Sequence, residues 1–347
     1  MEWWIIGLMG SKIPTIHRSK TPTTSAPMLR VLTYHRVANL QDSPNLNPQI
    51  ISATPENFEK QMRFVAEKYN VVSMPQVLET IARKECLPRR AVLITFDDAY
   101  YDFGEIAWPI LKALDLPATV FVPTAYPDQP ERAFWWDRLY RALMNTSRIE
   151  LRSTPIGILP LADAKMRQQS LKRLQHYIKS IRHREAMALV DEICDKLDAE
   201  PLTHKSVLSW NELRQLTKEG VTLCAHTQTH PIMTQLSPEE LRQEVAGSQR
   251  DLQREIGETL PIFCYPGGGH DDTVVNVLRE EGFTLAFTTL KGQNDLRTAD
   301  PLRLRRTNMT RRASLPIFRV KLMRWGAYLD RWRQKRRQQR QNRGLRQ

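Results

Sequence analysis

The sequence predicts an α/β fold in which strands and helices alternate along most of the chain. Short apolar segments rich in β-branched residues recur between segments that have the spacing of amphipathic helices. The clearest strand, Ala91-Val-Leu-Ile-Thr-Phe96, is apolar, as expected for a strand covered on both faces. Strands that alternate with helices form parallel sheets, and we expect this sheet to be a closed or nearly closed barrel.

The alternation can be followed from one end of the predicted barrel to the other. Strands are expected near residues 29–37, 71–72, 91–96, 118–122, 221–225, 262–264, 284–287 and 302–305. Helices are expected over 55–69, 75–84, 105–114 and 237–256, with another between the strands at 262–264 and 284–287. Ser237-Pro-Glu-Glu240 supplies an N-cap, a proline at the first helical position and an acidic first turn, which together predict a helix start.

The alternation stops between residues 127 and 204. Leu174, Tyr177, Ile178 and Ile181 recur there at helical intervals, which indicates a mainly helical segment. A separate helical domain is the alternative, but the barrel pattern returns directly afterwards and favours an insertion. We therefore predict an N-terminal segment and linker over 1–29, a barrel over 30–310 with a helical insertion at about 127–204, and a tail over 311–347.

The net charge of +13 is concentrated in this tail, which contains 13 Lys and Arg residues and one acidic residue. The rest of the chain carries a net charge of only +1. Phe318, Leu322, Trp325, Leu329 and Trp332 would form an apolar stripe on a basic helix. Such a helix suits the headgroup region of an anionic membrane. The alternative is that the stripe packs on the barrel and the polar end frays. Nucleic-acid binding ranks last, because base-reading motifs are absent.

The N-terminus does not resemble a targeting or membrane-spanning segment. Its apolar run, Trp3 to Met9, is seven residues long, and no basic residue precedes it. We therefore expect a protein that is cytoplasmic or peripheral to the membrane. The four cysteines show no CxxC pairing, so disulfides need not be invoked.

Two histidines, His226 and His230, follow the strand at 221–225 at a spacing of four. If a helical turn begins after the strand, both imidazoles lie on one face and can bind one divalent metal through neutral nitrogens. An ordinary surface or core pair is the alternative interpretation.

Two adjacent carboxylates, Asp97 and Asp98, end the strand at 91–96. Such a pair is unfavourable at a buried strand end unless a cation or hydrogen-bond donors compensate its charge. The residues allow either an Asx turn or a division of labour, in which one carboxylate binds a metal and the other is a general base.

Taken together, these motifs resemble a known family. Thr95-Phe-Asp-Asp98 and His226-Thr-Gln-Thr-His230-Pro231 resemble the first two signature motifs of the polysaccharide deacetylases, the NodB-homology or carbohydrate esterase 4 group. Supporting segments lie over 32–37, 208–213 and 263–268, so the resemblance spans roughly residues 30 to 307. It implies a deformed (β/α) barrel of about seven strands and removal of N-acetyl groups from an amino sugar in a polysaccharide or glycolipid.

The resemblance also implies roles for individual residues. It implies a metal site of Asp98, His226 and His230, for which we expect Zn²⁺, and Asp97 as the base that activates water. Two imidazoles and one carboxylate leave positions open on the ion for water and substrate. The substrate and the oxyanion of the reaction are expected to meet Tyr265, Pro266 and Gly267, with backbone N–H groups near Tyr265 as donors.

The sequence departs from the family pattern at three positions. Ala99 replaces a glycine that usually follows the two aspartates. Cys264 stands where many members have an arginine that orients the base, a role that Arg305 or Arg306 could take over.

The third departure concerns the general acid. The late Leu-x-His motif that supplies it has no match, and the last histidine is His270. We predict His35 as the acid, because residues at the carboxyl ends of barrel strands line active sites; a structural histidine is the alternative. Two other functions stay open: a hydrolase of another non-peptide C–N bond, and an inactive carbohydrate-binding protein.

Overall fold

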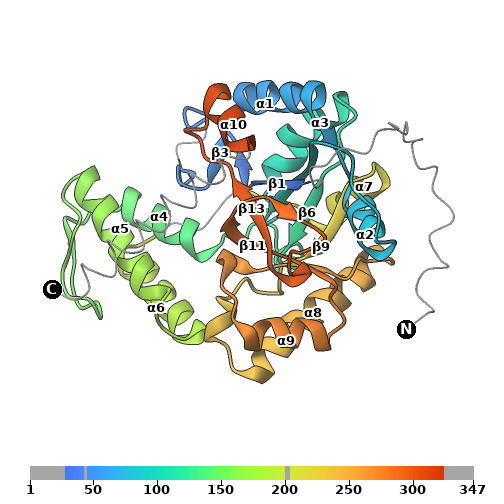
Figure 1. Cartoon of the computed structure of the whole chain (residues 1–347). Helices are drawn as coiled ribbons and strands as arrows, with labels where there is room; N and C mark the ends of the chain where they lie inside the picture. Colours follow the sequence, from blue (N-terminus) through green and yellow to red (C-terminus); the bar gives the residue numbers. More distant parts are fainter. Residues whose placement is uncertain (1–27, 43–44, 200–203, 324–347) are drawn as a thin grey trace.

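A closed barrel of seven parallel strands forms the centre of the computed structural model, which describes residues 28–42, 45–199 and 204–323 (Figure 1). The barrel strands are β1 (Met28–Tyr34), β5 (Ala91–Asp97), β6 (Thr119–Val122), β9 (Thr222–Ala225), β10 (Ile262–Cys264), β11 (Leu285–Lys291) and β13 (Leu304–Asn308). They follow the order β1-β13-β11-β10-β9-β6-β5, and β5 pairs with β1 to close the barrel. The predicted barrel of about seven strands is confirmed.

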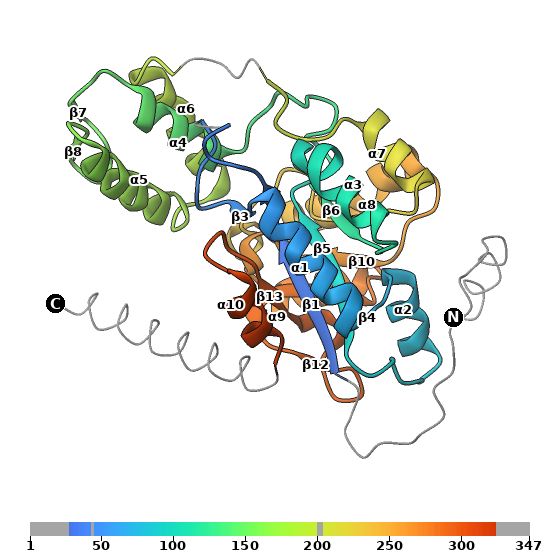
Figure 2. The ribbon, with the colours of Figure 1, turned by 90° about the horizontal axis from the view of Figure 1, so that it is seen from above.

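Short strands and a layer of helices surround this barrel (Figures 1 and 2). The helices are α1 (Pro55–Lys68), α2 (Met74–Ala82), α3 (Trp108–Ala113), α7 (Trp210–Lys218), α8 (Pro238–Ile256), α9 (Asp272–Glu280) and α10 (Leu315–Leu322). The short strands are β2 (Arg36–Val37), β3 (Ile51–Ala53), β4 (Asn70–Val71) and β12 (Asn294–Asp295). The start of α8 agrees with the prediction: the Ser237 hydroxyl accepts from the Glu240 N–H, and the Glu240 side chain accepts from the Ser237 N–H.

Strand alternation divides the core into two apolar clusters. In β5, Val92, Ile94 and Phe96 pack toward the surrounding helices, whereas Ala91 and Leu93 belong to the cluster that fills the barrel interior. Successive side chains of a strand point to opposite faces. Continuing this alternation places Asp97, the last residue of β5, on the interior face at the carboxyl end of the barrel.

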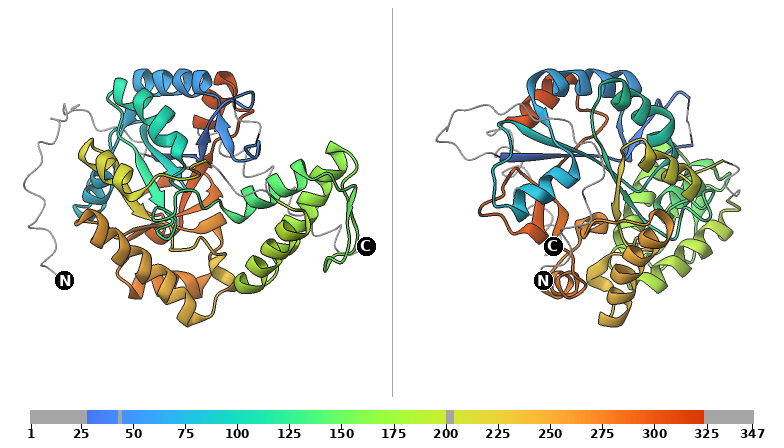
Figure 3. Two further views of the ribbon diagram at one scale, coloured as in Figure 1. Left: turned by 180° about the vertical axis from the view of Figure 1, so that it is seen from behind. Right: turned by 90° about the vertical axis from the view of Figure 1, so that its right-hand side faces the viewer.

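The segment between β6 and α7 projects from one side of the barrel, as Figures 1 and 3 show from opposite directions. It contains α4 (Trp135–Asn145), α5 (Ala164–Ile178), α6 (His183–Lys196) and an antiparallel pair, β7 (Glu150–Leu151) and β8 (Leu159–Pro160). The three helices share an apolar cluster of their own, which includes Leu139, Leu171 and Val190. The division of the chain into three parts stays a prediction.

Two predicted elements differ from the structure because of prolines. The helix expected over 105–114 is a π-helix over Phe103–Ala107 followed by α3. Pro109 has no N–H to donate, and its ring would clash with a carbonyl one turn earlier, so regular α-helical bonding cannot continue through it. The last strand was expected at 302–305 but begins at Leu304, because Pro301–Arg303 forms a 3₁₀ turn capped by Asp300.

The described residues contain only the first part of the predicted tail. In α10, Phe318 and Leu322 are buried in the cluster between barrel and helices, and the Phe318 ring contacts Phe64 of α1. Met323 is extended, with φ −75° and ψ 151°, so the helix ends at Leu322. The rest of the stripe, Trp325, Leu329 and Trp332, lies outside the described residues, as does the segment 1–27. Within the described ranges, no helix combines the length and apolarity needed to cross a membrane.

Candidate active site

The carboxyl ends of the barrel strands bring the predicted catalytic and metal-binding residues together. Asp97 ends β5 and Asp98 follows it, His226 follows β9, and His35 lies between β1 and β2. Asp98 and Ala99 have φ values of 73° and 48°, so the chain turns sharply after β5 in the left-handed region. This backbone conformation explains why the family usually has glycine where Ala99 stands.

The two histidines lie on a loop, so the helical turn considered for them does not form. Thr227 and His230 have φ values of 64° and 60°, which no right-handed helix contains. The Thr227 hydroxyl accepts from the His230 N–H over 3.0 Å and fixes the turn. The loop nevertheless directs both imidazole rings to the same place, with their centroids 4.9 Å apart.

Asp98, His226 and His230 form a compact group of possible metal ligands. The Asp98 Oδ1 atom lies 3.5 Å from His226 Nε2 and 3.3 Å from His230 Nε2. Ligands about 2.0–2.1 Å from a tetrahedral ion are roughly 3.3 Å apart, so these separations fit one ion. Asp98 Oδ1 is also buried with no hydrogen-bond partner among the described residues, as expected for an oxygen that needs a cation.

The orientation of the His226 ring and the protonation of His230 also suit a cation. His226 Nδ1 lies 2.7 Å from the carbonyl oxygen of Cys264 and donates to it, which leaves Nε2 as the ligand atom. Burial lowers the pKa of His230 to about 4, so this imidazole is neutral at physiological pH. Neutral imidazoles are the form that binds metals.

Asp97 pairs with Arg306, and its carboxylate also lies near His226 and Cys264. The Arg306 guanidinium donates to both carboxylate oxygens, over 2.7 and 2.8 Å, and its Nε donates to the Thr288 carbonyl over 2.9 Å. Burial alone would raise the pKa of Asp97, but the charge and hydrogen bonds of Arg306 hold it well below its usual range. Asp97 is therefore a carboxylate with a fixed orientation.

Arg306, and not Arg305, thus occupies the place of the missing arginine. Arg305 instead donates to the Lys291 carbonyl. Cys264, which replaces the usual arginine of the third motif, places its sulfur 3.8 Å from Asp97 Oδ2. Both β10 and β13 thus contribute a side chain beside Asp97, a small thiol from β10 and the guanidinium from β13.

His35 lies at the same mouth, close to the proposed base. Its Nε2 atom is 4.0 Å from Asp97 Oδ2, and its side chain is 29% exposed. The His35 N–H donates to the Ser52 hydroxyl over 2.9 Å, which fixes the backbone where β1 ends. His35 can therefore face both a bound substrate and the base.

Comparison with known proteins identifies the family. The family model described as polysaccharide deacetylase matches residues 84–286, which is more than half of the chain. The chain belongs to the polysaccharide deacetylase family. This deacetylase is therefore a hydrolase of the class that acts on carbon–nitrogen bonds other than peptide bonds.

Individual relatives are distant in sequence. YxkH of Bacillus subtilis is 19% identical over 271 residues, which are 78% of this chain and 67% of YxkH. The deacetylase PplD of Streptococcus pyogenes, solved in complex with acetate, has a TM-score of 0.58 at 19% identity, over 86% of this chain and all of PplD. IcaB from Ammonifex degensii has a TM-score of 0.55 at 18% identity, over 86% of this chain and 98% of IcaB. At these identities the structural likeness shows a common fold.

The third motif of this deacetylase differs from the predicted substrate site. The Tyr265 N–H donates to the Phe287 carbonyl over 3.0 Å, so it is not available to an oxyanion in this conformation. The Tyr265 side chain is buried and donates to the Leu302 carbonyl. Pro266 has no N–H, and Gly267 turns the chain with φ 59°. The Tyr265 N–H is therefore not a free donor here, and the expected contact of Tyr265, Pro266 and Gly267 with substrate and oxyanion stays a prediction.

Several residues near the site were not singled out from the sequence. Trp136 and Phe134, at the start of the insertion, pack their rings 4.8 and 5.7 Å from that of His230. Arg36, next to His35, is buried and pairs with Asp102 at 2.7 Å and with Asp137 at 3.7 Å. No local pattern indicated these contacts, although Phe134-Trp-Trp-Asp137 is conspicuous as an aromatic run before a helix.

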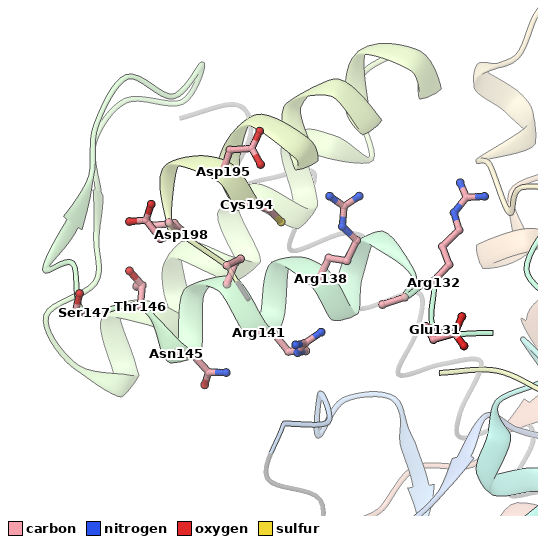
Figure 4. Close-up of a pocket in the computed structure, with 14 residues that line it drawn as sticks. Glu131, Arg132, Arg138, Arg141, Asn145, Thr146, Ser147, Cys194, Asp195 and Asp198 are labelled. Carbon is pink, nitrogen blue, oxygen red and sulfur yellow. The ribbon is translucent and has the colours of Figure 1, made fainter. Parts of the chain in front are cut away.

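A cavity of about 600 Å³ lies in the insertion of this deacetylase, between α4, α6 and the loops beside them (Figure 4). Its lining combines Arg132, Arg138 and Arg141 with Glu131, Asp195 and Asp198. None of the predicted metal-binding or catalytic residues lines it. The cluster at the strand ends, and not this cavity, has the groups that hydrolysis needs.

Proposed function

We propose that this protein is a metal-dependent deacetylase that removes N-acetyl groups from an amino sugar in a polysaccharide or glycolipid. The observation that supports this best is the position of the Asp98–His226–His230 group directly beside the Asp97–Arg306 pair. The two adjacent aspartates have different partners, so Asp98 is suited to bind a metal and Asp97 to accept a proton. Acetate is the acyl product of such a reaction, and the similar fold of PplD was solved with acetate.

Asp98, His226 and His230 would hold the metal, and their donor set of two imidazoles and one carboxylate favours Zn²⁺. When bound, such an ion lowers the pKa of water toward about 7 and polarises the amide carbonyl. His226 is already oriented for this role by the Cys264 carbonyl, and the unpaired Asp98 Oδ1 faces both Nε2 atoms.

Asp97 would accept a proton from the water that attacks the acetyl carbon. Its two hydrogen bonds from Arg306 fix the carboxylate plane and keep it ionised. They also make it a weak base, so proton transfer to it is favourable only from a water whose own pKa has been lowered. This dependence suits a base that lies directly beside one of the proposed metal ligands, Asp98, in the chain.

His35 would donate the proton that the leaving amine needs. Breaking the C–N bond transfers the bonding electrons to nitrogen, which must be protonated to leave as an amine. His35 Nε2 lies at the same mouth, 4.0 Å from the base, and no barrel strand separates the two. The acid and the base would thus act from adjacent strands, β1 and β5.

Release of acetate tests this proposal. Purified protein, stripped with a chelator and reloaded with Zn²⁺, should release acetate from N-acetylglucosamine oligomers, and the His226→Ala variant should not. Sugar binding without acetate release would favour an inactive carbohydrate-binding protein. Turnover of another C–N substrate without acetate release would favour a different hydrolase on the same scaffold.

We also propose that the basic segment from residue 324 to the end of the chain contacts an anionic membrane surface. Its support is the sequence alone: basic residues surround Trp325, Leu329 and Trp332. Such contact would keep the enzyme, as a peripheral protein, near lipid-linked or nascent polysaccharide.

A further inference from the structure

The two proposed histidine ligands are held in different ways. His226 has a partner for its second ring nitrogen, the carbonyl oxygen of Cys264 at 2.7 Å. His230 has none: among the described residues, its buried Nδ1 atom has no hydrogen-bond partner. A metal-binding histidine is ordinarily oriented through its second nitrogen. The position of His230 must therefore be set by its backbone and by the rings that pack against it.

The backbone that carries His230 is unusual for its residue types. Thr227 is β-branched and His230 is bulky, yet both are in the left-handed region, at φ 64° and 60°. A β-branched residue such as Thr227 rarely adopts such a conformation, which persists only where surrounding contacts determine it. The contacts that determine it here come from a distant helix, α8.

Glu244 of α8 supplies most of these contacts. Its Oε2 atom accepts from the backbone N–H groups of Gln228 and Thr229, over 2.7 and 2.9 Å. Its Oε1 atom accepts from the Thr229 hydroxyl over 2.5 Å. Three donors of the two residues between Thr227 and His230 thus converge on one carboxylate, and hydrogen bonds to an ionised acceptor are stronger than those between neutral groups.

The rest of the same helix face is shaped to receive the loop. Asp251, seven residues and two turns beyond Glu244, accepts from the Gln228 side-chain amide over 2.8 Å and from the Thr124 hydroxyl over 2.7 Å. Between them stands Gly247, where an added Cβ would lie only 2.3 Å from the Gln228 side chain. Spacings of three and four place these three residues on one face of α8.

We propose that Glu244 is a positioning residue of the metal site: it fixes the loop between His226 and His230 and thereby sets the affinity for the metal without touching the ion. This inference rests on the proposed function, because it takes His226 and His230 as ligands. Partners of metal ligands typically alter metal affinity about 10–100-fold when they are removed.

Metal binding by the full-length apoprotein tests the inference without relying on activity. Co²⁺ is titrated in, because its visible absorption reports both affinity and ligand geometry, and Zn²⁺ affinity is measured against a chromophoric chelator. Glu244→Ala should weaken binding of both ions about 10–100-fold and alter the Co²⁺ spectrum. Glu244→Gln, which keeps an acceptor oxygen but loses the charge, should fall between wild type and alanine.

Two controls keep the outcomes distinct. Glu239→Gln removes an exposed carboxylate from the first turn of the same helix and should bind both ions like wild type. His230→Ala should lose the Co²⁺ spectrum altogether. If Glu244→Ala does not fold, Glu244→Gln decides the question. If the folded Glu244 variants have wild-type affinity and spectrum, the inference about Glu244 is overturned and the proposed function is not. If the wild-type protein binds neither ion, both the inference and the proposed function are overturned.

Discussion

Arg306 donates hydrogen bonds to both carboxylate oxygens of Asp97, although the two residues are 209 positions apart and their strands are not neighbours in the barrel. The pair spans the barrel interior past β1, and both side chains are almost fully buried. One buried cation thus compensates one buried carboxylate, which leaves Asp98 as the carboxylate that needs a different cation.

Removing the cation of this pair should damage both stability and turnover. Arg306→Met leaves the Asp97 carboxylate buried and unpaired, which should lower the free energy of unfolding by about 3–5 kcal/mol. Metal content should stay unchanged, since Arg306 touches no proposed ligand. Urea denaturation and acetate release measure the two effects. Arg305→Met is the matched control, because the Arg305 side chain donates to the Lys291 carbonyl and not to Asp97. If Arg306→Met is as stable as wild type, the argument is refuted.

The two aspartates should respond differently to the same substitution. Asp97→Asn should keep the bound metal and reduce turnover about 10²–10⁴-fold, the usual contribution of a general acid or base. Asp98→Asn, His226→Ala and His230→Ala should lose metal and activity together. Metal analysis of the purified variants separates these outcomes. If Asp97→Asn also loses the metal, the assignment of base and ligand between the two carboxylates is wrong.

The general acid is tested through the pH dependence of turnover. If His35 protonates the leaving amine, His35→Ala should lower kcat sharply with unchanged metal content and should remove the alkaline limb of the pH–rate profile. Ser52→Ala, which removes only the hydroxyl that accepts from the His35 N–H, should have a smaller effect on kcat. Normal kinetics in His35→Ala would make His35 structural and direct attention to His270.

The barrel could be predicted because its signals are local. The strand that ends at Asp97 is mostly apolar and buried throughout, and the start of α8 has a complete capping box, so each could be recognised without its partners. The loop of His226 and His230 could not be predicted in the same way. Its left-handed residues depend on Glu244, a side chain on another element, and nothing between the two histidines indicates it.

The choice between Arg305 and Arg306 illustrates the same limit. Neighbouring residues of a strand point to opposite faces, so the boundaries and register of β13 decide which arginine enters the barrel. The 3₁₀ turn at Pro301–Arg303 displaces the start of the strand to Leu304. Leu304 lies in the interior cluster, so Arg306, two residues later, shares its face. From the sequence pattern alone, the partner of Asp97 could be either Arg305 or Arg306.

Asp137 should make the protein less stable as the pH rises. Burial raises the pKa of Asp137 to about 6, because the Arg36 cation offsets it only in part. The folded state therefore binds more protons than the unfolded state between about 3.9, the pKa of an unfolded aspartate, and the folded value. Stability conferred by the neutral form is present below this window and is lost as the pH rises through it.

Asp137→Asn removes this titration while keeping the shape of the side chain. The variant should exceed wild type in free energy of unfolding by on the order of 3 kcal/mol near pH 8, and should match it near pH 4. Urea denaturation at both pH values measures the difference, with the exposed Asp191→Asn as a control that should show none. A variant less stable than wild type near pH 8 would show that the ion pair with Arg36 outweighs the burial of the charge.

The membrane proposal concerns the segment after α10, and the structure determines where it should be cut. Phe318 and Leu322 are buried in the core, and the Leu322 carbonyl accepts from Arg30 Nε over 2.8 Å, so removing α10 would damage the barrel. A chain ending at Met323 should therefore keep its fold and activity but lose binding to vesicles that contain anionic lipid.

Full-length protein should co-sediment with these vesicles at low salt and dissociate as salt screens the basic residues. Trp325→Ser with Trp332→Ser should weaken binding at unchanged net charge, which separates insertion into the headgroup region from attraction by charge alone. Equal sedimentation of the full-length and shortened chains would refute the proposal.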